Sequence, residues 1–134
     1  MTNTDNTLLE DPNAFMRHIG AEMVDWRPDY VRFELSLEPF LMNRYDIPHG
    51  GVYASLLDTA MGYSACYTGD PNNKKLGMTL SMNVQFLSQP KGKLLIAEGR
   101  RVGGGKRTFF SEATIMDETG ETIATGAGVF RYRG

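Results

Sequence analysis

The stretch from Pro48 to Asp58 contains the residue types that acyl transfer requires. Pro48 and His49 precede two glycines, Gly50 and Gly51, where a helix-like segment begins. Glycines allow a ligand to approach the backbone, and the first helical turn leaves N–H groups unpaired at the positive end of the helix dipole. Such N–H groups can stabilise an oxyanion. On their own, two glycines before a helix more often form only a turn.

Asp58 is the second candidate, because it falls on a small and polar stripe of the predicted helix. Gly51, Ser55, Asp58 and Gly62 follow spacings of four, three and four residues, which places them on one helix face. Helix interiors disfavour aspartate, and a buried carboxylate is costly without partners. A catalytic base or nucleophile would explain its presence, and a carboxylate with purely structural partners is the alternative.

The elements that position these residues follow from hydrophobic periodicity. Short and long helices are predicted over 12–20 and 52–67, and the segment 30–38 alternates as a half-buried strand. Four further strands are predicted at 79–86, 93–101, 108–117 and 122–132. Short turns between them favour an antiparallel meander. An apolar helix before such strands predicts an α+β fold in which a curved antiparallel sheet wraps one central helix.

Composition restricts the function classes. The 134 residues are 41% hydrophobic and 22% charged, which indicates one domain, expected over 11–134 after a disordered arm at 1–10. A net charge of -2 argues against a nucleic-acid or anionic-membrane surface. The polar N-terminus lacks a secretory signal and no segment could span a bilayer, so a cytoplasmic protein is expected. The single Cys66 is expected to be buried and inert, and no metal site is expected.

A family resemblance strengthens the chemical interpretation. Asn43, His49-Gly50-Gly51 and Leu57-Asp58-Thr59-Ala60 together resemble the motif of hotdog-fold thioesterases of the phenylacetic-acid-degradation type. The segment 79–90 resembles the central strand of that family, and Gly120 with 124–126 resembles its last hairpin. The match covers roughly residues 10–132. One departure is the loop Tyr45-Asp46-Ile47, where family members commonly have a glycine.

This resemblance implies hydrolysis of an acyl-CoA, without a cofactor, in a homodimer or dimer of dimers. Asp58 would act as general base or nucleophile. Gly50, alone or together with Gly51, would donate an N–H to the thioester oxygen, aided by Asn43 or His49 of the partner subunit. Thr79 would help to hold the water with its hydroxyl group. For His49, a role in orienting the loop is at least as compatible with the motif as a direct role.

Two features leave the substrate open. The cationic glycine turn could bind the CoA nucleotide or be a solvated hairpin; its candidate residues are Arg101, Gly103, Gly104, Lys106 and Arg107. Aryl and medium-chain acyl groups are both possible. The aromatic residues that could line the acyl pocket, or simply belong to the core, are Phe40, Tyr45, Tyr53, Tyr63 and Phe86.

Two other functions remain as alternatives. The first is a hotdog protein that binds acyl-CoA without catalysis, against which Asp58 argues. The second is a hotdog hydratase or dehydratase acting on an enoyl or hydroxyacyl thioester. Such enzymes generally rely on a histidine with an acidic partner, whereas His49 lies in a thioesterase-like glycine motif.

Overall fold

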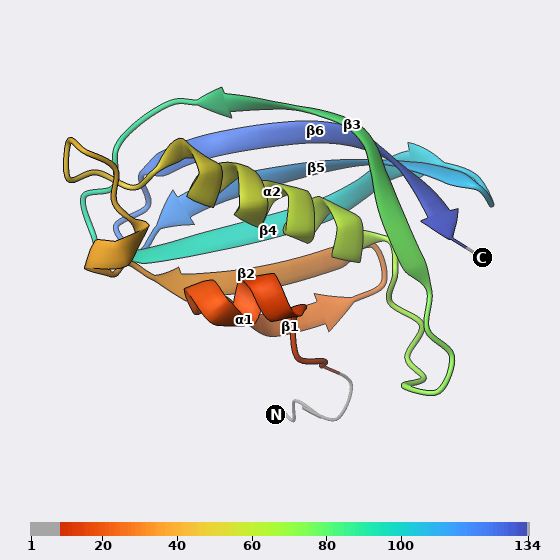
Figure 1. Cartoon of the computed structure of the whole chain (residues 1–134). Coiled ribbons are helices and arrows are strands. Elements are labelled where there is room, and N and C mark those ends of the chain that lie inside the picture. The colour runs from red at the N-terminus through yellow and green to blue at the C-terminus, as the bar shows by residue number, and fades with distance from the viewer. Residues whose placement is uncertain (1–8, 134) are drawn as a thin grey trace.

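The longest helix, α2 (Gly50–Ser64), carries apolar side chains around most of its circumference. Leu56, Leu57, Ala60 and Met61 are all fully buried. A helix of this kind must be covered on several sides. In the computed structural model, which describes residues 9–133, one curved antiparallel sheet provides most of that cover (Figure 1). The predicted α+β architecture is confirmed.

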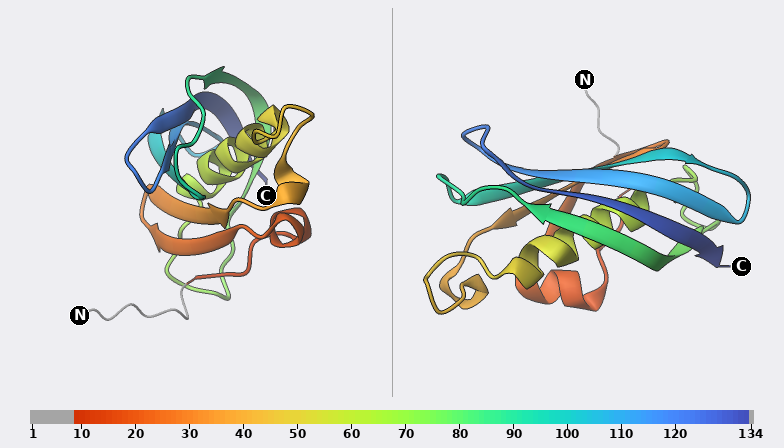
Figure 2. Two further views of the ribbon diagram at one scale, coloured as in Figure 1. Left: turned by 90° about the vertical axis from the view of Figure 1, so that its left-hand side faces the viewer. Right: turned by 90° about the horizontal axis from the view of Figure 1, so that it is seen from above.

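The sheet has six strands in the order β1-β2-β4-β5-β6-β3, and every neighbouring pair is antiparallel. Figure 2 shows how the sheet curls, with α2 lying along its concave side. Strand β3 forms one edge and β1 the other. The strand bounds are β1 (Glu22–Arg27), β2 (Tyr30–Ser36), β3 (Leu76–Phe86), β4 (Leu94–Gly104), β5 (Thr108–Asp117) and β6 (Thr122–Arg133).

The core lies between α2 and the sheet. Phe109 and Phe130 stack with their ring centroids 5.2 Å apart, and both are almost completely buried. Strand β4 approaches α2 so closely that a Cβ at Gly99 would collide with the carbonyl oxygen of Ala60. This contact fixes how closely the helix and the centre of the sheet can pack.

Two short helices complete the fold. Helix α1 (Ala14–Ile19) begins where the Asn13 side chain accepts a hydrogen bond from the Met16 N–H, and it ends at Gly20 in the left-handed conformation. Met16 and Ile19 are buried, so α1 packs onto the domain. A single 3-10 turn, η2 (Pro39–Leu41), follows β2.

The predicted meander is wrong for one strand. Strands β4, β5 and β6 follow one another, but β3 pairs with β6 at the far edge, and β2 takes the place beside β4. The segment 87–93 can cross from one edge to the middle of the sheet because it is longer than a tight hairpin turn. Periodicity identifies strands, but it does not identify their partners.

Strand β1 and the start of α2 also differ from the predictions. Residues 22–27 were not predicted as a strand, since a bulge between Met23 and Asp25 breaks their alternation. Helix α2 begins two residues earlier than predicted, at Gly50, and ends three residues earlier, at Ser64. Strand β4 continues to Gly104, so two of the three glycines predicted as a turn belong to the strand.

The predicted disordered arm lies mostly outside the described residues, which begin at Leu9. Leu9 packs against the core, and Glu10 is half-buried. Within 9–133, no helix is long and apolar enough to cross a membrane.

Asp117 connects the crossover segment to the sheet. Its buried carboxylate accepts hydrogen bonds from the backbone N–H groups of Lys91 (2.7 Å), Gly92 (2.9 Å) and Glu121 (3.2 Å), and also from the Thr119 hydroxyl (2.6 Å). The Thr119 hydroxyl, and then the backbone donors, hold the pKa of Asp117 well below its usual range. The ionised carboxylate therefore stabilises the segment that places β3 at the far edge.

We expect Asp117→Asn to lower the free energy of unfolding at neutral pH, because an amide cannot accept the same set of hydrogen bonds as a carboxylate. A folded pKa below the unfolded value means that the contribution is present above about pH 4 and is lost as the pH falls. Urea unfolding at several pH values should show a smaller loss of stability on acidification for the variant than for the wild type. The exposed Asp11→Asn is the control, and equal acid sensitivity of Asp117→Asn and wild type would contradict the expectation.

Candidate active site

His49 organises the entry to α2. Its Nδ1 atom accepts a hydrogen bond from the Gly51 N–H (2.8 Å), which makes His49 the N-cap of the helix. Nδ1 is then unprotonated and the ring hydrogen lies on Nε2. The Gly51 N–H is occupied by this cap, whereas the Gly50 N–H has no hydrogen-bond partner within residues 9–133. Of the two glycines, Gly50 is therefore the one able to donate to a ligand.

Asn43 shapes the loop before His49. Its Oδ1 atom accepts hydrogen bonds from the N–H groups of Tyr45 (2.8 Å) and Ile47 (3.4 Å), and its own N–H donates to the Ile47 carbonyl (2.8 Å). Asp46 adopts φ 61°, a left-handed conformation that aspartate tolerates better than most residues. The loop thus closes without a glycine at positions 45–47.

Asp58 and Thr79 are in direct contact. The Thr79 hydroxyl donates to Asp58 Oδ1 at 2.6 Å, which joins the middle of α2 to the edge strand β3. Because Oδ1 takes this hydrogen bond, Oδ2 is the oxygen available to a water or a substrate. Two residues that the sequence placed together by resemblance alone therefore meet in the structure.

A bulge in β3 makes the Asp58 contact possible. Thr79 is paired with Phe130 of β6 and faces α2, and the register then shifts between Thr79 and Ser81. After the shift, Met82 and Val84 are the half-buried residues that pack against the core. A regular strand that placed Met82 inward would turn residue 79 outward. The bulge allows one strand to supply both the Thr79 hydroxyl and part of the core.

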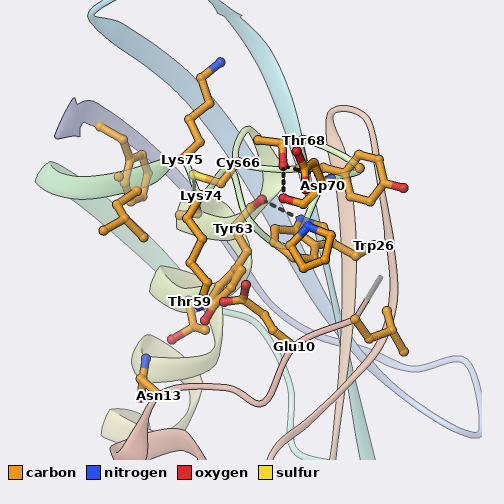
Figure 3. Close-up of a pocket in the computed structure, with 18 of the residues that line it drawn as sticks. Glu10, Asn13, Trp26, Thr59, Tyr63, Cys66, Thr68, Asp70, Lys74 and Lys75 are labelled. Carbon is orange, nitrogen blue, oxygen red and sulfur yellow. Dashed lines mark hydrogen bonds between the residues drawn. The ribbon is translucent and has the colours of Figure 1, made fainter. Parts of the chain in front are cut away.

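A cavity of about 470 Å³ opens beside Asp58. It extends along the second half of α2 between the segment before α1 and the loop that leads into β3 (Figure 3). Asp58 and Thr79 are part of its lining, and Gly62 leaves one side of the helix without a side chain. The aromatic residues of its lining are Trp26, Tyr63, Tyr67 and Phe130.

Burial changes the acid–base properties of the cavity wall. It raises the pKa of the Cys66 thiol to about 11, with Lys75 acting in the opposite direction. Cys66 is therefore a buried neutral thiol near neutral pH, and Gly62 accepts its hydrogen bond. Burial also raises the pKa of Tyr63, and the negative charge of Glu10 adds to the effect.

The glycine turn is not part of the cavity lining. The Arg101 guanidinium donates to the carbonyl groups of Gly103 (3.1 Å) and Gly105 (3.3 Å), so this side chain holds the hairpin. Lys106 and Arg107 are exposed. None of the five residues considered for the nucleotide lines the cavity.

The aromatic candidates are divided between different environments. Tyr63 lines the cavity, and Tyr53 is buried against Phe86 with ring centroids 6.1 Å apart. Phe40 and Tyr45 are largely exposed. Four other cavity residues were not predicted from the sequence: Glu10, Trp26, Tyr67 and Lys74. Isolated charged or aromatic residues outside long periodic elements carry no spacing signal.

Gly50 and Asp58 cannot serve the same carbonyl within one chain. Eight residues of helix separate them, which corresponds to about 12 Å along the axis. An oxyanion donor must lie within hydrogen-bond distance of the oxygen that it stabilises, and the base must lie near the same carbonyl carbon. The two halves of the candidate site are present in the chain, but far apart.

Comparison with protein families gives one match, which spans more than half of the chain. The family model described as the thioesterase superfamily matches residues 45–124, and so includes His49, Gly50, Asp58 and Thr79. The chain belongs to the thioesterase superfamily.

Solved structures agree with this fold. The PaaI protein from the phenylacetic acid degradation operon of Escherichia coli superposes with a TM-score of 0.79 at 20% identity, over 91% of this chain and 86% of that one. The conserved protein PA5202 of Pseudomonas aeruginosa superposes with a TM-score of 0.82 at 20% identity, over 98% of this chain and 100% of that one. Thioesterase HI1161 of Haemophilus influenzae superposes with a TM-score of 0.80 at 16% identity, over 91% of this chain and 84% of that one. At these identities the likeness concerns the fold alone.

Curated relatives are similarly distant. A protein of Mycobacterium tuberculosis that is provisionally named an esterase is 21% identical over 113 residues, which is 84% of this thioesterase-superfamily chain and 81% of the relative. Within residues 9–133, no group of three or more histidine, cysteine, aspartate or glutamate side chains is arranged to hold a metal ion.

The cap at His49 can be tested separately from catalysis. We expect His49→Ala to lower the free energy of unfolding by about 1 kcal/mol. His49→Asn should keep most of the wild-type stability, because asparagine is a strong N-cap acceptor. Urea denaturation of both variants measures the difference. Equal stability of His49→Ala and wild type would show that the cap does not support the helix.

Proposed function

We propose that this thioesterase-superfamily protein hydrolyses acyl-CoA thioesters and that Asp58 is its catalytic carboxylate. The observation that carries the proposal is the Thr79–Asp58 hydrogen bond at the side of a cavity large enough for an acyl group. The family membership and the provisional esterase name of distant relatives support hydrolysis. The acyl-CoA assignment rests on the resemblance of the motif around His49 and Asp58.

The hydrolytic step can be derived from the residues in place. Asp58 Oδ2 removes a proton from water, and the water oxygen forms a bond to the thioester carbon. The resulting oxyanion is stabilised by the Gly50 N–H. Collapse of this intermediate breaks the carbon–sulfur bond, and the CoA thiolate receives a proton from the Asp58 carboxyl group. Direct attack by Asp58, followed by hydrolysis of the anhydride, uses the same residues.

A complete site requires two chains in this proposal. Because the Gly50 N–H lies about 12 Å along α2 from Asp58, the donor must come from Gly50 of the partner subunit. Strand β3 forms an edge of the sheet. A two-fold axis at that edge, perpendicular to the sheet, would pair the two β3 strands antiparallel and place the two α2 helices side by side and antiparallel. The start of one helix would then lie beside the middle of the other.

The surface of β3 supports such a pairing. Leu76, Met78 and Leu80 are 52%, 46% and 54% exposed, although they are large apolar side chains. An exposed apolar edge strand is an unusual feature of a monomer, because it promotes association. Pairing through β3 would cover these side chains and satisfy the backbone groups of the edge. The further association into a dimer of dimers remains part of the proposal.

The hydratase alternative receives less support from the site. Its histidine would need an acidic partner, whereas His49 Nδ1 is engaged with the Gly51 N–H. Binding without catalysis would leave the short Thr79–Asp58 contact without a chemical purpose.

We expect Asp58→Asn to lower kcat/KM for acyl-CoA hydrolysis by at least about a hundredfold, because the amide cannot remove a proton from water. Thiol release across a panel of acyl-CoAs measures the effect. Ser55→Ala is the matched control: Ser55 lies on the same helix face, and its hydroxyl donates only to the Gly51 carbonyl. Unchanged hydrolysis in folded Asp58→Asn would refute the assignment of the carboxylate, and no hydrolysis by the wild type would refute the function.

A second experiment tests the division of the site between chains. Proline is favoured at the first position of a helix, and the extended His49 backbone is compatible with a following proline, so Gly50→Pro should remove the N–H without unfolding α2. We expect a loss of about a hundredfold in kcat. Gly50→Ala is the control, since it keeps the N–H and its Cβ would make only ordinary contacts with Phe86 at 3.6 Å.

Mixing the two inactive variants then distinguishes a shared site from a single-chain site. After dissociation and reassociation, a dimer of Gly50→Pro with Asp58→Asn has one intact site, and about a quarter of wild-type sites should be recovered in an equal mixture. No recovery, despite subunit exchange verified with differently tagged chains, would contradict a site built from two chains.

A further inference from the structure

The wall of the cavity beside Asp58 contains a polar cluster that acyl hydrolysis does not use. Tyr63 lies five residues beyond Asp58, about 7.5 Å further along the axis of α2. Glu10, which precedes α1, and Lys74, which precedes β3, line the same cavity with Tyr63 (Figure 3). The cluster therefore lies within reach of the distal end of an acyl group whose carbonyl is at Asp58.

The Glu10 carboxylate is an acceptor that is only partly satisfied. It is half-buried and lines the same cavity as Tyr63, whose pKa its negative charge helps to raise. A carboxylate has about four lone-pair positions, and among residues 9–133 no ion pair is formed by Glu10. Water can fill the remaining positions only while the cavity is open.

A bound acyl group would change this balance. A hydrocarbon end would displace water from the Glu10 carboxylate without donating a hydrogen bond in its place. Such desolvation of a charged group costs free energy. An acyl end with a hydroxyl group would donate to the carboxylate instead. Sites built around such a hydrogen bond reject analogues that lack the donor much more strongly than apolar pockets reject analogues of a different size.

We propose that Glu10 is a specificity-determining residue that selects acyl groups with a hydrogen-bond donor, such as a hydroxyl, at the end remote from the thioester. This inference rests on the proposed acyl-CoA hydrolysis, since it assigns the cavity to the acyl group. The rest of the lining is compatible with it. Trp26 and Phe130 provide apolar walls for the body of the acyl group, and the Trp26 indole N–H is already bonded to the Tyr63 carbonyl at 3.0 Å.

The test compares two series of acyl-CoAs of the same lengths, one ending in a hydroxyl group and the other in a methyl group. We expect the wild type to prefer the hydroxyl series by about tenfold in kcat/KM at the best length. Glu10→Leu should abolish or reverse this preference, by slowing the hydroxyl series and accelerating the methyl series. The control Glu22→Leu removes the same charge at an exposed position of β1 and should leave the ratio unchanged.

A reversal of preference separates recognition from support of the fold, because a destabilised protein would lose activity on both series. Competitive inhibition by the free acids provides a second readout that does not depend on turnover. If Glu10→Leu loses stability in thermal unfolding, Glu10→Gln is used instead, and it should lower the preference while keeping the shape of the side chain.

Gly62→Ala tests whether the acyl group occupies the cavity at all. The added methyl group would make ordinary contacts with Phe130 at 3.6 Å, so the helix tolerates it while the cavity becomes narrower. We expect both series to lose several-fold in kcat/KM. Unchanged kinetics of both series would overturn the inference.

Other results would also overturn it. If the wild type hydrolyses both series equally, or if Glu10→Leu keeps the wild-type ratio, Glu10 does not select the substrate, although the hydrolytic function stands. A preference for carboxylate-ended acyl groups that disappears in Lys74→Met would assign selection to Lys74 instead. Absence of thiol release from every acyl-CoA would refute the hydrolytic function itself.

Discussion

The fold depends on covering an apolar helix that also carries a carboxylate. Most of α2 must be buried, and the curved sheet covers it from β2 round to β3. Asp58 is the exception, because its carboxylate needs a polar partner and access to solvent or substrate. The edge strand β3 meets both needs with the Thr79 hydroxyl, beside a cavity that stays open. The hydrogen bond between Asp58 and Thr79 is thus the point where packing and chemistry meet.

The bulge in β3 allows Thr79 to face α2 while Met82 and Val84 of the same strand face the core. The sequence 79–86 alternates as though Thr79 and Ser81 shared a face, and an unbroken strand would keep Thr79 away from α2 whenever Met82 and Val84 face the core. The shift between Thr79 and Ser81 removes this conflict. Alternation predicted the strand correctly, but the change of face could not be predicted from it.

Local patterns predicted most of the fold and the two halves of the candidate site. The short helix α1, the long α2 and five of the six strands followed from periodicity and turn residues. The order of the strands in the sheet did not follow from these patterns, because strand pairing depends on contacts between residues that are distant in sequence. Glu10, Tyr63 and Lys74 are likewise distant in sequence, and they come together only in the folded cavity lining. The hydrogen bonds of Asn43 within the loop required side-chain geometry that spacing does not contain.

The attachment of the crossover segment has a consequence for how this sequence can vary. Asp117 binds residues 91 and 92 only through their backbone N–H groups, and Glu118 accepts from the N–H groups of Lys93 and Leu94 in the same way. These contacts of Asp117 and Glu118 therefore depend on the path of the chain and not on the side chains of residues 91–94. Drift at positions such as Lys91 should be tolerated, whereas Gly92 has no room for a Cβ beside Glu118. Asp117, the last residue of β5, and Glu118, which follows it, thus hold the crossover segment through backbone contacts that do not depend on the side chains of residues 91–94.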